Sequence, residues 1–182
     1  EQGNESMTLK EWVINYWTTN SQMTIPGRVL IPKSLINQAG GWNEELSLND
    51  DLEFYTRLFS YADKITINPN AVLKYRSGIN GLSQQKGDKK KQIDQYKSIS
   101  LAVERVLNLY PEKMIKLACA NIYQSFVFEC YPMNIQLIKM AEKKIISLGG
   151  SNIKFKSGGY TKILVNILGW KITKSIKKKL QN

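Results

Sequence analysis

The sequence predicts an α+β fold that is predominantly helical. Apolar residues recur at three-to-four spacing over most of residues 92–180, whereas short strand-like runs are confined to the first half. Between the halves, residues 78–91 gather Gly, Ser, Gln and Lys, a composition typical of a connecting segment. We therefore predict a first unit at residues 1–80, a linker at 81–91, and a helical subdomain at 92–182 that ends in a basic helix.

The first half is predicted to mix helices with short strands. Leu9–Thr18 has the apolar spacing of a helix. Asn49–Tyr61 begins with an N-cap residue, carries acids in its first turn and has an apolar stripe, which also indicates a helix. Gly27–Ile31 and Lys64–Tyr75 predict strands, and Gly40-Gly41 predicts a turn.

Four helices are predicted in the second half: Gln92–Leu109, Glu112–Glu129, Met133–Leu148 and Tyr160–Leu180. The second is apolar on most sides, so we expect it to be central. In the last helix the apolar side chains recur every four residues, with lysines on the other side. These apolar residues are Leu164, Leu168, Ile172, Ile176 and Leu180.

The composition excludes several chemistries and points to an acidic partner. The 182 residues include 26 basic, 15 acidic and no histidine residues, for a formal net charge of +11. Without histidine there is no Ser-His-Asp triad, no His-based zinc site and no imidazole proton shuttle, so a general base must be a carboxylate, Lys, Tyr or thiol. The charge is +1 over residues 1–91 and +10 over residues 92–182, which indicates nucleic acid or an anionic membrane surface as a partner.

The cysteines and the hydropathy pattern predict a cytoplasmic location. Cys119 and Cys130 form no CxxC pair, so we expect two buried thiols in a reducing compartment. No apolar run approaches the roughly 18 residues needed to span a bilayer, and the first residues do not resemble a signal peptide.

Residues 40–57 contain the most informative cluster of polar side chains. Asp50 and Asp51 are adjacent carboxylates at a predicted helix N-terminus, where the helix dipole favours the ionised form. A carboxylate held there can accept a proton from a hydroxyl that attacks an electrophile. An ordinary structural explanation also applies: Asp50 and Glu53 would form a capping pair, and Glu53 and Arg57 an i,i+4 salt bridge.

A series of short motifs follows in order over about 60 residues: Gly27-Arg28-Val29-Leu30-Ile31-Pro32, Gly40-Gly41-Trp42-Asn43-Glu44, Asp50-Asp51-Leu52-Glu53-Phe54-Tyr55-Thr56-Arg57, Tyr75-Arg76-Ser77-Gly78 and Leu82-Ser83. This ordered series resembles the C-terminal, acceptor-side part of family 2 inverting glycosyltransferases, which have the GT-A fold. The resemblance implies transfer of a sugar, with inversion, from a nucleotide-sugar to a hydroxyl of a glycan or lipid-linked acceptor. The fold expected from it is the C-terminal part of an α/β GT-A domain followed by a helical subdomain.

The resemblance also assigns roles to individual residues. Asp51 matches the catalytic base that deprotonates the acceptor hydroxyl, and Asp50 matches the acid beside it, which acts as a helper or a cap. Trp42 matches an aromatic residue near the acceptor and would stack on a sugar ring or anchor the core. Arg76 would reach the donor diphosphate or pair with an acid near the site, and Arg28 is a weaker candidate for the same role.

One departure from the family bears on activity. The nucleotide-binding half and its Asp-x-Asp motif, which holds Mg²⁺ or Mn²⁺ on the diphosphate, do not precede Glu1. We therefore expect the chain to be a fragment of a longer enzyme, to bind no metal and to be inactive alone. Strands that would normally extend the sheet of the missing half could be covered by self-association into a homo-oligomer.

The basic C-terminal helix supports an alternative function, a non-enzymatic helical module that binds anionic membranes. An amphipathic helix rich in lysine can lie on the inner face of the membrane with its apolar side in the interface. The same helix could instead pack on the domain with its lysines in solvent. We do not expect nucleic-acid binding, because the basic half has no recognition module and only one arginine, Arg105.

Overall fold

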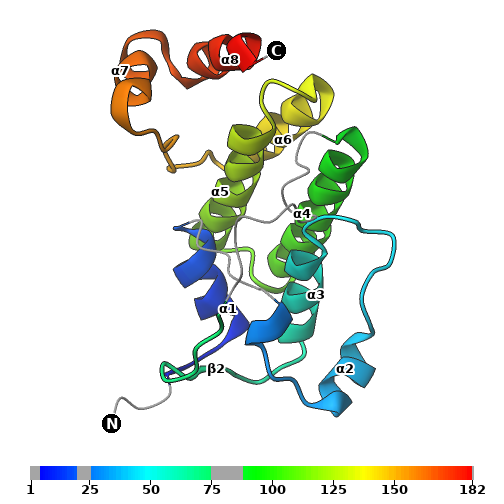
Figure 1. Cartoon of the computed structure of the whole chain (residues 1–182). Helices are drawn as coiled ribbons and strands as arrows, with labels where there is room; N and C mark the ends of the chain where they lie inside the picture. Colours follow the sequence, from blue (N-terminus) through cyan, green and yellow to red (C-terminus); the bar gives the residue numbers. More distant parts are fainter. Residues whose placement is uncertain (1–4, 20–25, 75–87, 182) are drawn as a thin grey trace.

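A computed structural model describes residues 5–19, 26–74 and 88–181 of the chain (Figure 1). The described part is predominantly helical, as predicted, with one small antiparallel sheet. Helices α4 (Lys89–Leu109) and α5 (Lys113–Cys130) lie side by side along the length of the molecule (Figure 1). Helix α3 (Asp50–Phe59) packs on α4, and α6 (Ile135–Ser147) packs on α5.

The N-terminal residues form a strand and an irregular helix. Strand β1 (Glu5–Met7), which the sequence did not predict, pairs antiparallel with β2 (Ile65–Ile67), and Ser6 lies opposite Thr66. Helix α1 (Leu9–Trp12) begins in a capping box, in which the backbone N–H of Thr8 donates to Glu11 and that of Glu11 donates to the Thr8 hydroxyl. The helix continues as a π-helical turn, Val13–Trp17, which packs against α5.

The strand predicted at Gly27–Ile31 is wrong. Pro26–Arg28 instead form a 3₁₀ turn, and residues 29–31 pair with no strand that the structure describes. Pro26 has no N–H for a ladder, and Leu30 is fully exposed, so the run lacks the one-sided burial that stabilises a strand. Within the described residues 64–74, the second predicted strand is reduced to β2, because a turn follows at Asn68.

Helix α2 (Lys33–Ala39) was not predicted and leads into the Gly-Gly turn. Pro32 occupies its N-cap position, where a missing N–H costs nothing. Gly40 ends it with φ = 85°, a conformation that L side chains rarely adopt, and its N–H donates to the Ile36 carbonyl.

The first three helices of the second half begin and end within a few residues of their predicted positions. The Asp88 carboxylate caps α4 by accepting from the N–H groups of Lys90 and Lys91. Residues 89–91 of the predicted linker therefore belong to this helix, and residues 81–87 of the linker lie outside the described part of the chain. Helix α5 is central and buried on most sides, as predicted. Both cysteines lie on it, buried and not joined in a disulfide, which confirms the burial expected for them.

The predicted C-terminal helix is two helices. Helix α7 (Gly159–Leu168) ends at Gly169, whose φ of 79° stops the helix, and α8 (Trp170–Gln181) begins at the next residue. Every fourth position remains apolar through the break, which is why the spacing alone indicated a continuous helix. The two helices contact each other at one end of the molecule, beyond the end of α5 (Figure 1).

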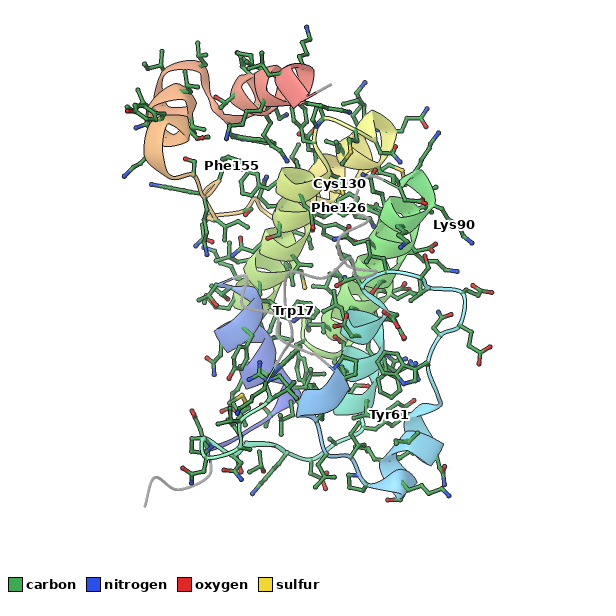
Figure 2. All side chains as sticks on the ribbon, in the orientation of Figure 1. Trp17, Tyr61, Lys90, Phe126, Cys130 and Phe155 are labelled. Carbon is green, nitrogen blue, oxygen red and sulfur yellow. The ribbon has the colours of Figure 1, made fainter. Side chains whose placement is uncertain are left out.

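One hydrophobic core joins residues from both sides of the predicted linker. It extends from Trp12 and Phe59 to Val106, Phe126 and Ile138. In Figure 2, Phe126 and Cys130 mark the C-terminal half of α5 within this core. Within the described residues, no helix is both long enough and apolar enough to cross a bilayer.

Candidate functional site

The two candidate carboxylates lie in the first turn of α3. Asn49, immediately before it, has φ = 61° and makes no side-chain cap, so it occupies the predicted N-cap position without the predicted hydrogen bond. Asparagine is among the residues best suited to this left-handed conformation. The Leu52 N–H donates to Asp51 Oδ1 (2.9 Å), and both Asp50 and Asp51 are half-buried. The helix N-terminus therefore holds the Asp51 carboxylate at the surface in a fixed orientation.

Arg57 connects this helix to the Gly-Gly turn. Its guanidinium donates to both carboxylate oxygens of Glu53, Nε–Oε1 at 2.6 Å and Nη2–Oε2 at 3.1 Å, which confirms the predicted i,i+4 salt bridge. The same guanidinium also donates to three successive backbone carbonyls. Those acceptors are Ala39, Gly40 (3.1 Å) and Gly41 (2.8 Å). One side chain therefore fixes the turn to the helix that carries Asp51.

The position of Gly40 depends on this arrangement. A Cβ placed on it would lie 3.3 Å from Arg57 Nη1, in addition to the backbone strain at φ = 85°. A side chain at this position would therefore strain the backbone of the turn and would also require the guanidinium to shift by a few tenths of an ångström.

Trp42 follows the turn and packs against aromatic side chains of α3. Its ring stacks on Phe54 of α3 with centroids 4.0 Å apart and an interplanar angle of 17°, and it meets Tyr55 edge-on. It is nevertheless 40% exposed, so the side chain is packed on one side and accessible to a ligand on another. A rigid aromatic surface of this kind is suited to stacking on a sugar ring.

Helix α4 fixes the loop between Trp42 and α3. The buried Asp94 carboxylate accepts from both the N–H and the hydroxyl of Ser47, and the Ser98 hydroxyl donates to the Asn49 carbonyl. These contacts could not be predicted from the sequence, because they join residues 47 to 49 positions apart and neither Asp94 nor Ser98 belongs to a motif.

The 3₁₀ turn that carries Arg28 is attached to α3, the helix that carries Asp51. The Tyr55 hydroxyl donates to the Pro26 carbonyl (3.2 Å), and burial, followed by the nearby Asp51 charge, raises the pKa of Tyr55. Arg28 itself is exposed. Arg76 lies outside the described residues, although the chain leading to it passes this turn, where Leu73 packs against Gly27.

A cleft of about 630 Å³ begins beside Asn49. It runs along α5 and reaches the loop at residues 153–156, and its lining mixes apolar residues with Gln95, Glu129 and lysines. Asp51 and Trp42 do not line it. No group of three or more Asp, Glu, Cys or His side chains within the described ranges is arranged to hold a metal ion.

No family model matches the chain, and neither the curated proteins nor the solved structures include a significant match to it.

Proposed function

We propose that this chain is the acceptor-side part of an inverting glycosyltransferase, with Asp51 as the general base. The observation that carries the proposal is the Arg57 guanidinium, which binds Glu53 and the carbonyls of residues 39–41. Through it, separate motifs of the family pattern form one rigid unit that holds a carboxylate and a partly exposed tryptophan. Preorganised placement of this kind is what an acid–base site requires.

In the proposed reaction, an acceptor hydroxyl donates its proton to Asp51 as its oxygen attacks the anomeric carbon of the donor sugar. The new C–O bond forms as the bond to the nucleoside diphosphate breaks, and the diphosphate leaves with the electron pair. Attack from the opposite face inverts the anomeric configuration. A carboxylate is a suitable base because its proton can pass to solvent after transfer.

The other candidates have supporting roles. Trp42 would stack on the acceptor ring. Asp50 would place a second carboxylate at the positive end of the helix dipole, beside Asp51. Arg28 and Arg76 would lie toward the donor diphosphate. The nucleotide-sugar and its Mg²⁺ or Mn²⁺ would be bound by a nucleotide-binding half. The described residues offer no group of three or more His, Cys, Asp or Glu side chains that could hold that ion.

The test is Asp51→Asn in the complete enzyme that contains this chain. We expect sugar transfer, measured as nucleoside diphosphate release across a panel of nucleotide-sugars with an acceptor mixture, to fall about 10³-fold. Donor binding should be retained, because the amide keeps the shape of the carboxylate. In the source cells, the chromosomal substitution should remove the same glycan as a deletion does.

Asp63→Asn is the matched control, since Asp63 is exposed beyond the far end of α3. It should leave transfer unchanged, and circular dichroism should show both variants folded. A folded Asp51→Asn enzyme that transfers sugar as fast as the wild type would remove Asp51 as the base.

A further inference from the structure

Helices α7 and α8 expose an unusual amount of apolar surface. Most large apolar side chains of α7, and the whole four-residue repeat of α8, are exposed to solvent. These residues are Tyr160, Ile163, Leu164, Ile167, Leu168, Ile172, Ile176 and Leu180. Helix α7 has no buried residue at all. In a helix that merely covers a core, this side would face inward.

Polar residues in the middle of α8, rather than its apolar repeat, face the body of the protein. Thr173 is almost completely buried, and Lys174 Nζ donates to the carbonyls of Phe128 and Glu129 at the end of α5. A lysine at the C-terminus of a helix satisfies carbonyls that have no partner within the helix. Burial lowers the pKa of Lys174 in this position.

An aromatic cluster fixes the same orientation. Trp170 stacks on Phe155 (5.6 Å between centroids, 19°) and meets Phe128 and Tyr131 edge-on. Figure 2 shows Phe155 where the C-terminal pair joins the body. A salt bridge from Lys171 to Glu142 of α6 adds a further attachment. The outward direction of the apolar side is therefore built into the packing.

The charge of this region identifies what could cover the apolar surface. Residues 152–182 contain eight lysines and no acid. Lys156, Lys177 and Lys178 line a cleft of about 640 Å³ between the pair and the end of α5, where Glu129 is the one acidic lining residue. A second copy packed on the same surface would bring like charges together, whereas anionic lipid headgroups would neutralise them.

We propose that the α7–α8 pair docks this protein on an anionic lipid bilayer. The exposed apolar side chains enter the boundary between headgroups and acyl chains, and the exposed lysines Lys162, Lys178 and Lys179 contact the lipid phosphates. The pair lies on the surface, since neither helix is long enough to cross it. This attachment is independent of the proposed sugar transfer. It would bring the membrane to the end of the molecule where the cleft beside Asn49 opens toward residues 153–156.

The test is co-sedimentation of the full chain with vesicles of phosphatidylcholine alone and of an equal mixture of phosphatidylcholine and phosphatidylglycerol. We expect binding to the anionic vesicles only, weakening as salt is added. Replacing Lys178 and Lys179 by Gln should lower the partition coefficient about 30-fold. The matched control replaces Lys143 and Lys144 on α6, which are also exposed and adjacent, and should change it less than threefold.

A second pair of variants tests the apolar contribution. Ile163→Asp with Ile167→Asp, at side chains 56% and 73% exposed, should reduce binding at least tenfold without unfolding the protein. The control is Ile146→Asp on α6, where the side chain is 76% exposed, and this variant should bind the vesicles as the unaltered chain does.

Three results would overturn the proposal. The first is absence of binding to anionic vesicles at low ionic strength. The second is an equal loss of binding from the α6 and α8 lysine variants, which would mean attraction by net charge alone. The third is a stable dimer in sedimentation equilibrium that Ile163→Asp with Ile167→Asp converts to monomer, because the pair would then be a contact between copies.

Discussion

Replacing Arg57 by methionine should destabilise the protein by about 3–4 kcal/mol. The side chains of Arg57 and Glu53 are only 14% and 9% exposed, so the substitution leaves a buried carboxylate without its cation. Breaking a buried pair from one side costs roughly 3–5 kcal/mol. The Gly40 and Gly41 carbonyls add little to this, because their bonds to Arg57 lie at the exposed surface and water can replace the guanidinium.

The assay is urea unfolding of the full chain followed by far-UV circular dichroism. The midpoint should fall while the m-value stays unchanged, as for a loss of stability without a change in compactness. Arg28→Met is the control. Because this arginine is exposed, its replacement should change the free energy of unfolding by less than about 0.5 kcal/mol. Replacing both Glu53 and Arg57 by methionine should recover at least half of the loss, because no unpaired charge remains.

Two outcomes would refute this reasoning. One is a loss below about 1 kcal/mol for Arg57→Met, a value typical of an exposed ion pair. The other is a double variant no more stable than the single one, which would show that the unpaired Glu53 charge is not the source of the cost.

Gly40→Ala should cost about 2 kcal/mol in the same assay, because alanine is strained at φ = 85° and its Cβ displaces Arg57. Gly150→Ala, at φ = 92° with open space around it, should cost less, and equal losses would mean that the Arg57 contact contributes nothing. Burial raises the pKa of Tyr123 to about 12, whereas an unfolded tyrosine titrates near 10. The stability that depends on this phenol should therefore be complete below about pH 10 and be lost as the pH rises toward 12, and a phenolate absorbance titration that shows all tyrosines ionising together near pH 10 in the folded state would contradict it.

The long helices could be predicted because their apolar periodicity matches the surface that they bury. Helix α5 is central for the reason that its composition indicated, and the Asp88 cap marks a helix start that lies close to the predicted one. The break at Gly169 was missed because the apolar repeat continues across it, and only the backbone angle distinguishes one helix from two. Strand β1 is three residues long and exists because β2 pairs with it, a partnership that local sequence does not encode.

Some contacts of the candidate site could likewise be predicted from the sequence, and others could not. The Glu53–Arg57 pair follows from helix geometry and was predicted. The contacts of Arg57 with the turn at residues 39–41, and of Asp94 with Ser47, join segments that approach only after α2, α3 and α4 have packed. The strand at Gly27–Ile31 failed for a related reason, since the Tyr55 hydroxyl binds the Pro26 carbonyl in a turn.

The hydrogen bonds from Arg57 to the turn at residues 39–41 also bear on how the sequence of this protein could change in evolution. Residues 39–41 are held on α3 and Ser47 is held on α4, so the intervening loop departs from and returns to fixed points. Closing a longer loop between fixed ends is inexpensive, about 0.6 kcal/mol for each doubling of length. Insertions and substitutions after Trp42 can therefore present new side chains while Gly41 and Ser47 stay in place. Under the proposed function, acceptor preference could drift in evolution at this loop while the chemical step stays the same.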